Sequence, residues 1–235
     1  MKKILLLICL IPVFLFSQYK SGTITYVAID VKKSTITDSI INTKERIADV
    51  KTLKFILNFD TISSEFYAIE TVKLDENVSL YTKMISGVSR LYYNKLSENK
   101  IINYPLEKRK IGSHAIKSTN NIKWKLINEK RIINGYECYL ARGFFKNYDI
   151  YRPDFNLEAW YCPAIPIAIG PKWYSGLPGL ILELTDDRIT FCVEKIDFDS
   201  KPLLKKLKKN KYKLMTDEQY SEYRLARAIK ESKHI

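Results

Sequence analysis

Residues 173–184 read Trp173-Tyr-Ser-Gly-Leu-Pro-Gly-Leu-Ile-Leu-Glu-Leu184, with two glycines on either side of a Leu-Pro pair, directly before a strongly apolar run. The chain has only 8 glycines and 8 prolines in 235 residues. Proline restricts φ and lacks an N–H donor, while glycine accepts positive φ. Pro178-Gly179 suits positions i+1 and i+2 of a type II turn. We therefore predict a stiff turn that leads into a strand at 180–184.

The stiff segment extends back to residue 163, because three more prolines and another glycine precede the turn. We predict that residues 163–179 form a crossover between strands at 157–162 and 180–184. Two roles stay open for this crossover: it holds a binding groove, or it covers the open end of a curved sheet. The candidate residues for ligand binding or for the structure of the crossover are Trp160, Pro166, Gly170, Pro171, Trp173, Tyr174, Gly176, Leu177, Pro178 and Gly179.

The same segment does not match a nucleotide site. No Gly-Lys-Ser or Gly-Lys-Thr follows the GLPG stretch, and a strand rather than a helix comes next, so the helix N-terminus that attracts phosphate is missing. Ser175 does not stand in a GxSxG elbow.

Short alternating apolar and polar runs recur along most of the chain, and turn residues such as Asn134-Gly135 separate them. This pattern predicts a mainly β protein with about nine to eleven antiparallel strands, and no regular βαβ alternation is present. We expect the strands to form one curved sheet, a half-barrel or open barrel, because curvature limits the exposed strand edges that could pair with other chains. By analogy of fold alone, periplasmic lipoprotein carriers have such a sheet. A short helix or loop is expected over residues 38–50.

The C-terminal part, from about residue 200, differs from the rest. Lys201–Lys213 is rich in lysine, which is typical of a solvated stretch and also suits weak contact with an anionic surface. Thr216 and Gln219 fit a capping box at the start of a helix. One face of that helix would carry Tyr220, Tyr223, Ala226 and Ile229.

The first residues predict export. MKKILLLICLIPVFLFSQ combines two lysines, an apolar run and a small residue at Ser17, the pattern of a signal peptide. We expect residues 1–17 to be removed and residues 18–235 to form a single β-rich domain in the periplasm or cell envelope of a Gram-negative bacterium. Loss of Lys2 and Lys3 lowers the net charge from +13 to +11. Export argues against a nucleic acid partner.

The stretch Gly170-Pro171, Tyr174 and Gly176-Leu-Pro-Gly-Leu-Ile181 resembles the signature of the GLPGLI family of exported Bacteroidetes proteins. Gly135-Tyr-Glu-Cys138, Ala159-Trp-Tyr161 and Ile165-Pro166 are similar to the same pattern, and the resemblance covers about 124–184. It implies export and a shared fold, and it implies no reaction.

Three cysteines follow the signal segment, at 138, 162 and 192. If residues 136–145 and 156–162 form a hairpin, Cys138 and Cys162 lie nearly opposite one another at its open end. Cross-strand neighbours approach closely enough for a disulfide when they face the same side, so we predict a Cys138–Cys162 contact and a candidate disulfide. Cys192 would then be the remaining thiol, and its alternation with Phe191 indicates burial.

Catalytic signals are weak. The two histidines are His114 and His234, and an acyl-transfer arrangement would need His114 with Cys138, Cys162 or Ser175. HExxH is absent, and Glu158 and Glu183 are the carboxylates nearest the crossover. We therefore assign no catalytic residue, metal or cofactor.

Three functions remain open. The favoured hypothesis is a non-catalytic protein that binds or carries a hydrophobic or peptide-like ligand in the envelope. The alternatives are an interaction module of an outer-membrane transport complex and an envelope hydrolase. An apolar cavity open to solvent would support a carrier, and an interior filled by its own side chains would count against one. A hydrolase needs His114 or paired acids to converge in one cleft.

Overall fold

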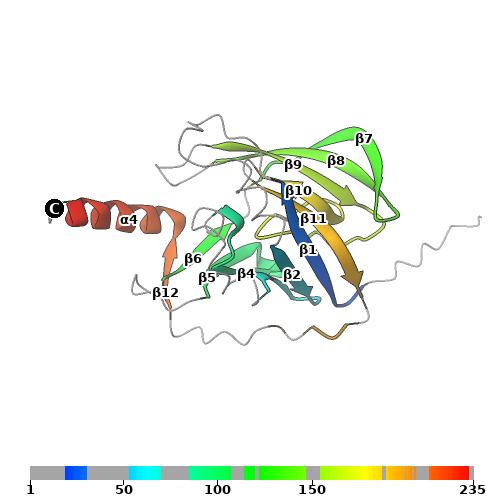
Figure 1. Ribbon diagram of the computed structural model, residues 1–235. Coiled ribbons are helices and arrows are strands. Elements are labelled where there is room, and N and C mark those ends of the chain that lie inside the picture. The colour runs from blue at the N-terminus through cyan, green and yellow to red at the C-terminus, as the bar shows by residue number, and fades with distance from the viewer. Residues whose placement is uncertain are drawn as a thin grey trace, which may run out of the picture.

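A single twelve-stranded sheet dominates the structure, a computed structural model that describes residues 19–30, 53–69, 85–106, 114–119, 122–146, 154–186, 189–198, 200–202, 204 and 212–232. The strand order is β12-β6-β5-β4-β3-β2-β1-β11-β10-β9-β8-β7, and the two end strands do not pair with each other. The sheet curves strongly around a central space without closing (Figure 1). The predicted mainly β fold with an open, curved sheet and a C-terminal helix is confirmed.

The strands are short, and most of them pair with the strand that precedes or follows them in the sequence. Their bounds are β1 Gly22–Asp30, β2 Lys54–Phe59, β3 Ser63–Ala68, β4 Arg90–Lys95, β5 Lys100–Pro105, β6 His114–Thr119, β7 Lys125–Ile133, β8 Tyr136–Phe145, β9 Phe155–Cys162, β10 Leu180–Thr185, β11 Thr190–Asp197 and β12 Lys213–Thr216. A short 3-10 helix, η1 Leu96–Glu98, lies between β4 and β5.

Alternation along the strands fixes which side faces the core. In β9, Phe155, Leu157, Ala159 and Tyr161 are buried, whereas the side chains between them are more exposed. This period of two is the signature of a sheet with one buried face. The predicted Asn134-Gly135 turn is present between β7 and β8, with φ values of 49° and 83°, as the tight hairpin turns require.

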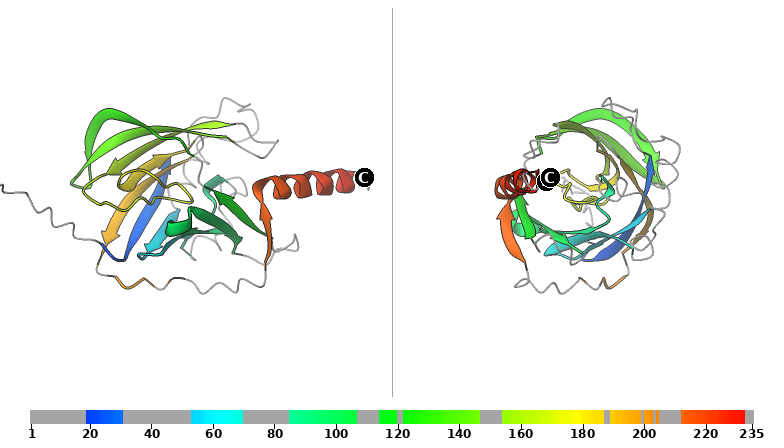
Figure 2. Two further views of the ribbon diagram at one scale, coloured as in Figure 1. Left: turned by 180° about the vertical axis from the view of Figure 1, so that it is seen from behind. Right: turned by 60° about the vertical axis from the view of Figure 1, so that its left-hand side comes forward.

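The core fills the concave side of the sheet. Phe55, Phe66 and Phe191 form an aromatic group, with ring centroids 5.1 to 5.7 Å apart. Residues 163–179, drawn in yellow, fold back inside the curve instead of running around it (Figure 2). Ile165 and Ile169 of this segment belong to the same buried cluster.

Two strands were missed by the sequence analysis, and both lie at one end of the sheet. β6 and β12 have six and four residues, too short to show a clear alternation. β12 pairs with β6 in parallel, with Leu214 opposite Ala115. A parallel neighbour almost 100 residues away has no local signal, so sequence analysis counted fewer strands.

The C-terminal helix α4 Asp217–Ser232 begins as predicted. The Thr216 hydroxyl accepts the Gln219 N–H at 3.3 Å, and the Gln219 side chain accepts the Thr216 N–H at 3.0 Å. Tyr220 and Tyr223 lie beside His114 of β6, with ring centroids 6.5 and 4.7 Å away. The rest of α4 extends away from the body (Figure 1).

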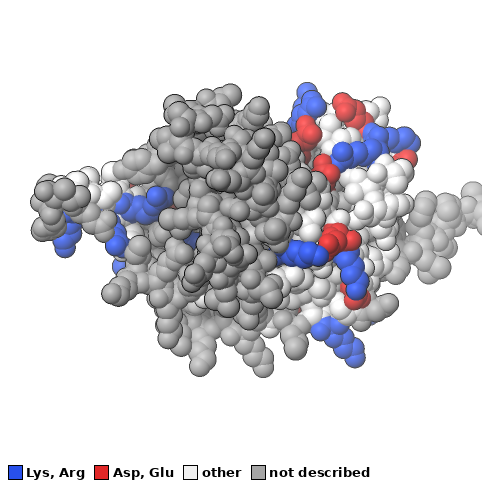
Figure 3. Space-filling model, viewed as in Figure 1, with Lys and Arg blue, Asp and Glu red and all other residues white. Residues whose placement is uncertain are grey.

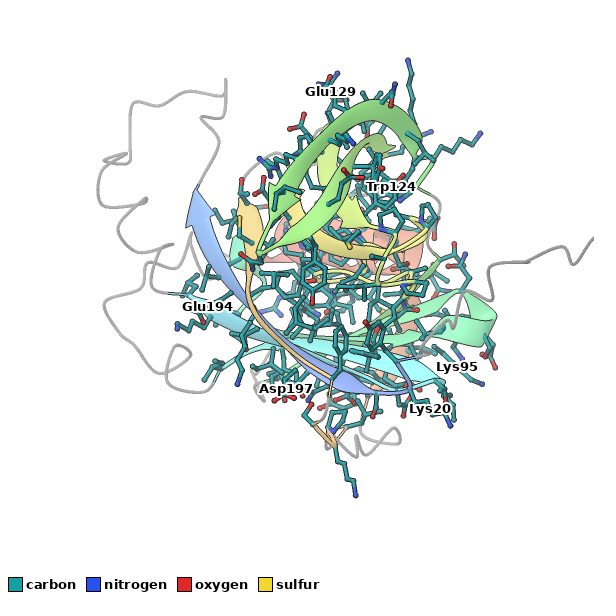
Figure 4. All side chains as sticks on the ribbon, turned by 90° about the vertical axis from the view of Figure 1, so that its right-hand side faces the viewer. Lys20, Lys95, Trp124, Glu129, Glu194 and Asp197 are labelled. Carbon is teal, nitrogen blue, oxygen red and sulfur yellow. The ribbon has the colours of Figure 1, made fainter. Side chains whose placement is uncertain are left out.

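Several predictions fall outside the described residues: the signal peptide, the helix or loop at 38–50, and most of Lys201–Lys213. On the face shown in Figure 3, acidic and basic side chains are interspersed over the described residues, which is typical of a solvated surface. Lys20, Glu129, Glu194 and Asp197 likewise lie at the periphery (Figure 4).

Candidate functional site

The crossover, residues 163–179, adds its own backbone hydrogen bonds to β10. Leu180 N donates to Ile165 O at 2.9 Å, and Ile181 N donates to Ile169 O at 3.0 Å. These bonds hold the returning chain against the strand that it leads into. The predicted stiffness of the crossover therefore has a further source besides its prolines.

The turn at Pro178 differs from the prediction. Gly179 has φ of 159° instead of the value near +80° that position i+2 of a type II turn requires. Gly179 N donates to Leu177 O at 2.8 Å, so the turn is a tighter three-residue one around Pro178. Packing requires glycine at this position, because a Cβ on Gly179 would lie 2.1 Å from the Cys162 carbonyl oxygen.

Gly170, a second glycine of the crossover, also lies in close contact with a neighbouring segment, at Ile181 of β10. A Cβ on Gly170 would lie 2.7 Å from Cδ1 and 2.8 Å from Cβ of Ile181. The absence of a side chain thus allows the crossover to sit directly on β10.

Most apolar residues of the crossover fill the concave side of the sheet. Ile165, Ile169, Tyr174 and Leu177 are at most 1% exposed. The other predicted glycines and prolines of the crossover differ in exposure. Gly170 and Pro171 are buried, whereas Pro166, Gly176 and Pro178 are exposed. The buried set is core, so only the exposed positions and their neighbours can meet a ligand.

A buried ion pair ties the crossover to the turn after β10. Lys172 Nζ lies 2.8 Å from Asp186 Oδ2, donates to Ile85 O at 3.0 Å, and stands 4.9 Å above the Phe191 ring. The two side chains are only 4% and 7% exposed. Asp186 Oδ1 also accepts the Ile189 N–H at 3.0 Å. We call this group the Lys172–Asp186 clamp.

The sequence analysis missed the clamp because nothing local distinguishes Lys172 from the other lysines. It has φ of 53°, an uncommon value for a residue with a side chain. Buried charges are stable when they are paired and hydrogen-bonded, and both conditions hold here. The clamp positions the crossover.

The predicted tryptophans occupy different environments. Trp173 packs between Tyr92 and Tyr174, with both ring centroids 5.2 Å away. Its buried Nε1 has no hydrogen-bond partner among the described residues. Trp124, labelled in Figure 4, lies before β7. Its Nε1 donates to Ser175 O at 2.9 Å.

Trp160 lies apart from this group. Arg131 stacks on its ring at 4.2 Å, and it is only partly buried at the edge of the core. It is therefore neither a fully buried core residue nor a member of the groove described next.

A groove of about 390 Å³ lies between the crossover and the β4–β5 connection. We call it the crossover groove; its lining residues are Asn94, Leu96, Asn99, Ile122, Ala168, Ser175 and Gly176. This volume lies within the range of about 300–1,000 Å³ that is typical of small-ligand sites. The lining combines two amides and a hydroxyl with apolar side chains, which suits a ligand with its own amide groups.

Cys138 and Cys162 lie together as predicted. The register of β8 and β9 pairs Tyr139 with Tyr161, so the two cysteines are the next opposed positions, and, after burial, Cys162 contributes to the raised pKa of Cys138. Both are free and fully buried. The contact is present, and the disulfide stays a prediction.

The thiols are poor nucleophiles. Burial, with a smaller effect of Cys162, raises the pKa of Cys138 to about 12. Burial, with a smaller effect of Glu183, raises the pKa of Cys192 to about 12. Cys138 and Cys192 therefore stay protonated near neutral pH. Their reactivity is low, because the thiolate is the reactive form.

Each of the two acidic candidates is paired with a different arginine. Glu158 pairs with Arg142 at 3.4 Å, and Glu183 pairs with Arg131 at 2.5 Å. Across the described ranges, no group of three or more His, Cys, Asp or Glu residues could hold a metal ion. The geometry gives a hydrolase no support.

Comparison with known proteins adds a family match over part of this region. Residues 147–183 match a family model described as "Protein of unknown function (Porph_ging)". The match includes the crossover and covers a minor part of the chain. It is consistent with the resemblance noted from the sequence, and membership of the GLPGLI family remains a hypothesis. No curated protein matches the chain.

Two solved structures, both of a protein named PNGF-II, are similar in fold. The P21 crystal form of PNGF-II matches with a TM-score of 0.52 and 13% sequence identity. The match covers 86% of this chain and 32% of the PNGF-II chain. The C2 crystal form matches with a TM-score of 0.49 and 12% sequence identity, over 84% of this chain and 31% of the PNGF-II chain. The chain thus spans about a third of PNGF-II. At this identity the likeness concerns the fold alone.

Among the helices that the structure describes, none is both long and apolar enough to cross a membrane.

Proposed function

We propose that the protein binds a peptide-like ligand in the crossover groove, without catalysis. The observation that carries this proposal is the lining of the groove. Asn94, Asn99 and Ser175 offer amide and hydroxyl groups, and Leu96 and Ile122 offer apolar contacts. A peptide needs both, because its backbone amides must stay hydrogen-bonded when they leave water.

The hydrophobic-carrier form of the hypothesis receives less support. A carrier of lipid-sized molecules needs an apolar cavity inside the curved sheet. The crossover occupies this space instead, with Ile165 and Leu177 at 0% and 1% exposure. A ligand therefore meets the exposed rim of the crossover and does not enter the core.

Rigidity supports the same proposal. The Lys172–Asp186 clamp and the hydrogen bond from Trp124 to Ser175 O fix the wall of the groove on two sides. A preformed wall lowers the entropy that binding costs.

Two exposed alanines of the crossover provide a matched test. Ala168 lines the groove, and Ala164 lies on the same crossover outside the lining. We would measure binding of an equimolar mixture of acetylated tetrapeptides by saturation-transfer NMR. Ala168→Trp should abolish the transfer signal, and Ala164→Trp should retain it. Equal signals from both variants, or none with the unmodified protein at millimolar peptide, would refute the proposal.

We also propose that the protein acts after export. The basic and apolar segment at residues 1–17 supports this. N-terminal sequencing of the protein recovered from its host should begin near Gln18. A chain that starts at Met1 would contradict export by a cleaved signal.

A second candidate, the interaction module, is favoured by the edge strand β7. Leu126 and Ile132 of this strand are 54% and 65% exposed, and an unpaired edge can accept a partner strand. Native mass spectrometry of the protein from its own envelope would then retain a protein partner. Ile132→Lys should release that partner, whereas it should leave tetrapeptide binding unchanged.

A further inference from the structure

A second concave site lies on the opposite face of the sheet from the crossover. It has a volume of about 340 Å³, and its lining residues are Tyr93, Lys95, Glu98, Lys100, Ile102, Tyr104, Ala115, Tyr212 and Leu214. In β4, Tyr92 faces the core and contacts Trp173. Tyr93 and Lys95 alternate with the core-facing positions, so they point to the outer face. We call this site the outer-face pocket.

The C-terminal strand closes the pocket. Tyr212 immediately precedes β12, and its ring meets Tyr104 edge-on at 5.3 Å between centroids. Its hydroxyl donates to Pro105 O at 3.5 Å. Leu214 pairs with Ala115 across β12 and β6. Two parts of the chain that are far apart in sequence therefore form one pocket.

Three phenol groups meet in this pocket. Burial, and then the proximity of Tyr93 and Tyr212, raises the pKa of Tyr104. The Tyr104 phenol therefore keeps its proton more strongly than usual, and a protonated phenol can both donate and accept a hydrogen bond. Their rings also present flat apolar faces.

The charge of the pocket is positive. Glu98 pairs with Lys95, and the charges of Lys95, Lys100 and Lys117 all act on its carboxylate. Two ammonium groups, of Lys95 and Lys100, therefore line the pocket beside one carboxylate, and Lys117 acts on that carboxylate from outside the lining. Lys100 lines the pocket, and no salt bridge to it occurs among the described residues, so its ammonium can meet an anionic ligand.

We propose that the outer-face pocket binds an acidic saccharide of one or two sugar units. Aromatic faces can stack on a sugar ring, phenol hydroxyls can bind its hydroxyl groups, and Lys100 can bind a carboxylate. An apolar ligand would leave these polar groups without partners, which costs free energy. The volume lies near the lower limit of about 300 Å³ for small-ligand sites, so the occupant is short.

The proposal is independent of the crossover groove, because the two sites share no lining residue. Binding at the outer-face pocket should also hold β12 and α4 against the sheet. Amide signals of residues 212–216 in a two-dimensional NMR spectrum would report this directly.

The test is an NMR titration of the full mature protein with digalacturonate, cellobiose and sodium sulfate, each at the same ionic strength. Digalacturonate should bind at least about tenfold tighter than cellobiose, with shifts at Tyr93, Lys100 and Tyr212. Lys100→Gln and Tyr212→Phe should each weaken it about tenfold or more. Both variants preserve most of the packing, and Tyr212→Phe retains the ring.

Lys130→Gln is the matched control, because Lys130 is an exposed lysine whose ion pair with Glu137 lies on β7 and β8. It should bind digalacturonate as the unmodified protein does. Three results would overturn the proposal: no shift with digalacturonate at 10 mM, equal loss in the control, or sulfate binding as tightly at the same residues, which would indicate an adventitious ion only.

Discussion

The close approach of the crossover to the end of β9 predicts a large effect of Gly179→Ala. The added Cβ would lie 2.1 Å from Cys162 O, 2.6 Å from Cys162 C and 2.9 Å from Pro163 N. All three are backbone atoms, so no side-chain rotation relieves the contact. The backbone at Gly179 must move about 1 Å or more away from the backbone at Cys162 to restore ordinary contact distances of about 3.5 Å.

Two terms set the magnitude. Overpacking of a well-packed site costs about 1–3 kcal/mol and occasionally more. The shift also strains the nearby bond from Leu180 N to Ile165 O, and loss of such a hydrogen bond costs about 1 kcal/mol. The two terms together lower the expected free energy of unfolding by about 2–4 kcal/mol.

Gly135→Ala is the control. Gly135 has φ of 83°, and nothing lies within 4 Å of its added Cβ. This change should therefore cost only the left-handed backbone penalty of about 1–2 kcal/mol. Urea unfolding followed by tryptophan fluorescence measures both variants. If Gly179→Ala loses no more stability than Gly135→Ala, the crossover is not packed against Cys162 as the structure has it.

Three further predictions follow from the buried polar groups. Lys172→Met removes the ammonium that pairs with Asp186 and should cost about 3–5 kcal/mol in urea unfolding, whereas Lys130→Met, at an exposed pair, should cost under about 1 kcal/mol; equal losses would contradict the clamp. The reduced protein should lose stability as pH rises from about 9 towards about 12, because the unfolded state releases thiol protons that native Cys138 and Cys192 retain; unfolding midpoints at pH 8 to 11 that stay flat or rise would contradict this. Refolding from urea with oxidised glutathione, when the thiols are accessible, should join Cys138 to Cys162, leaving one free thiol in the mature protein and adding about 3–4 kcal/mol for a loop of about 25 residues; three free thiols after such refolding, or a bridge that includes Cys192, would contradict the opposed register.

Local patterns in the sequence were sufficient for most of the strands. The runs at 136–145 and 157–162 located β8 and β9, because a side-chain period of two follows from the strand backbone itself. The Asn134-Gly135 turn and the capping box at Thr216 were also predictable, since each involves groups within a few residues.

The candidate site was only partly predictable. The prolines and glycines identified the crossover as rigid, but they did not show that most of it is core. Trp160 and Trp173 were both candidate site residues, yet Trp160 lies under Arg131 and the crossover carries Trp173 to Tyr92.

The sequence by itself thus determined most of the strands, the Asn134-Gly135 turn, the helix start and the expected stiffness of residues 163–179. The tertiary structure alone decided the parallel pairing of β12 with β6, the Lys172–Asp186 clamp, the three-residue turn at Pro178 and the two pockets. The physical reason is range: propensities and turn preferences act over a few residues. Pairing across a curved sheet, by contrast, depends on the register and packing of segments that are distant in the chain.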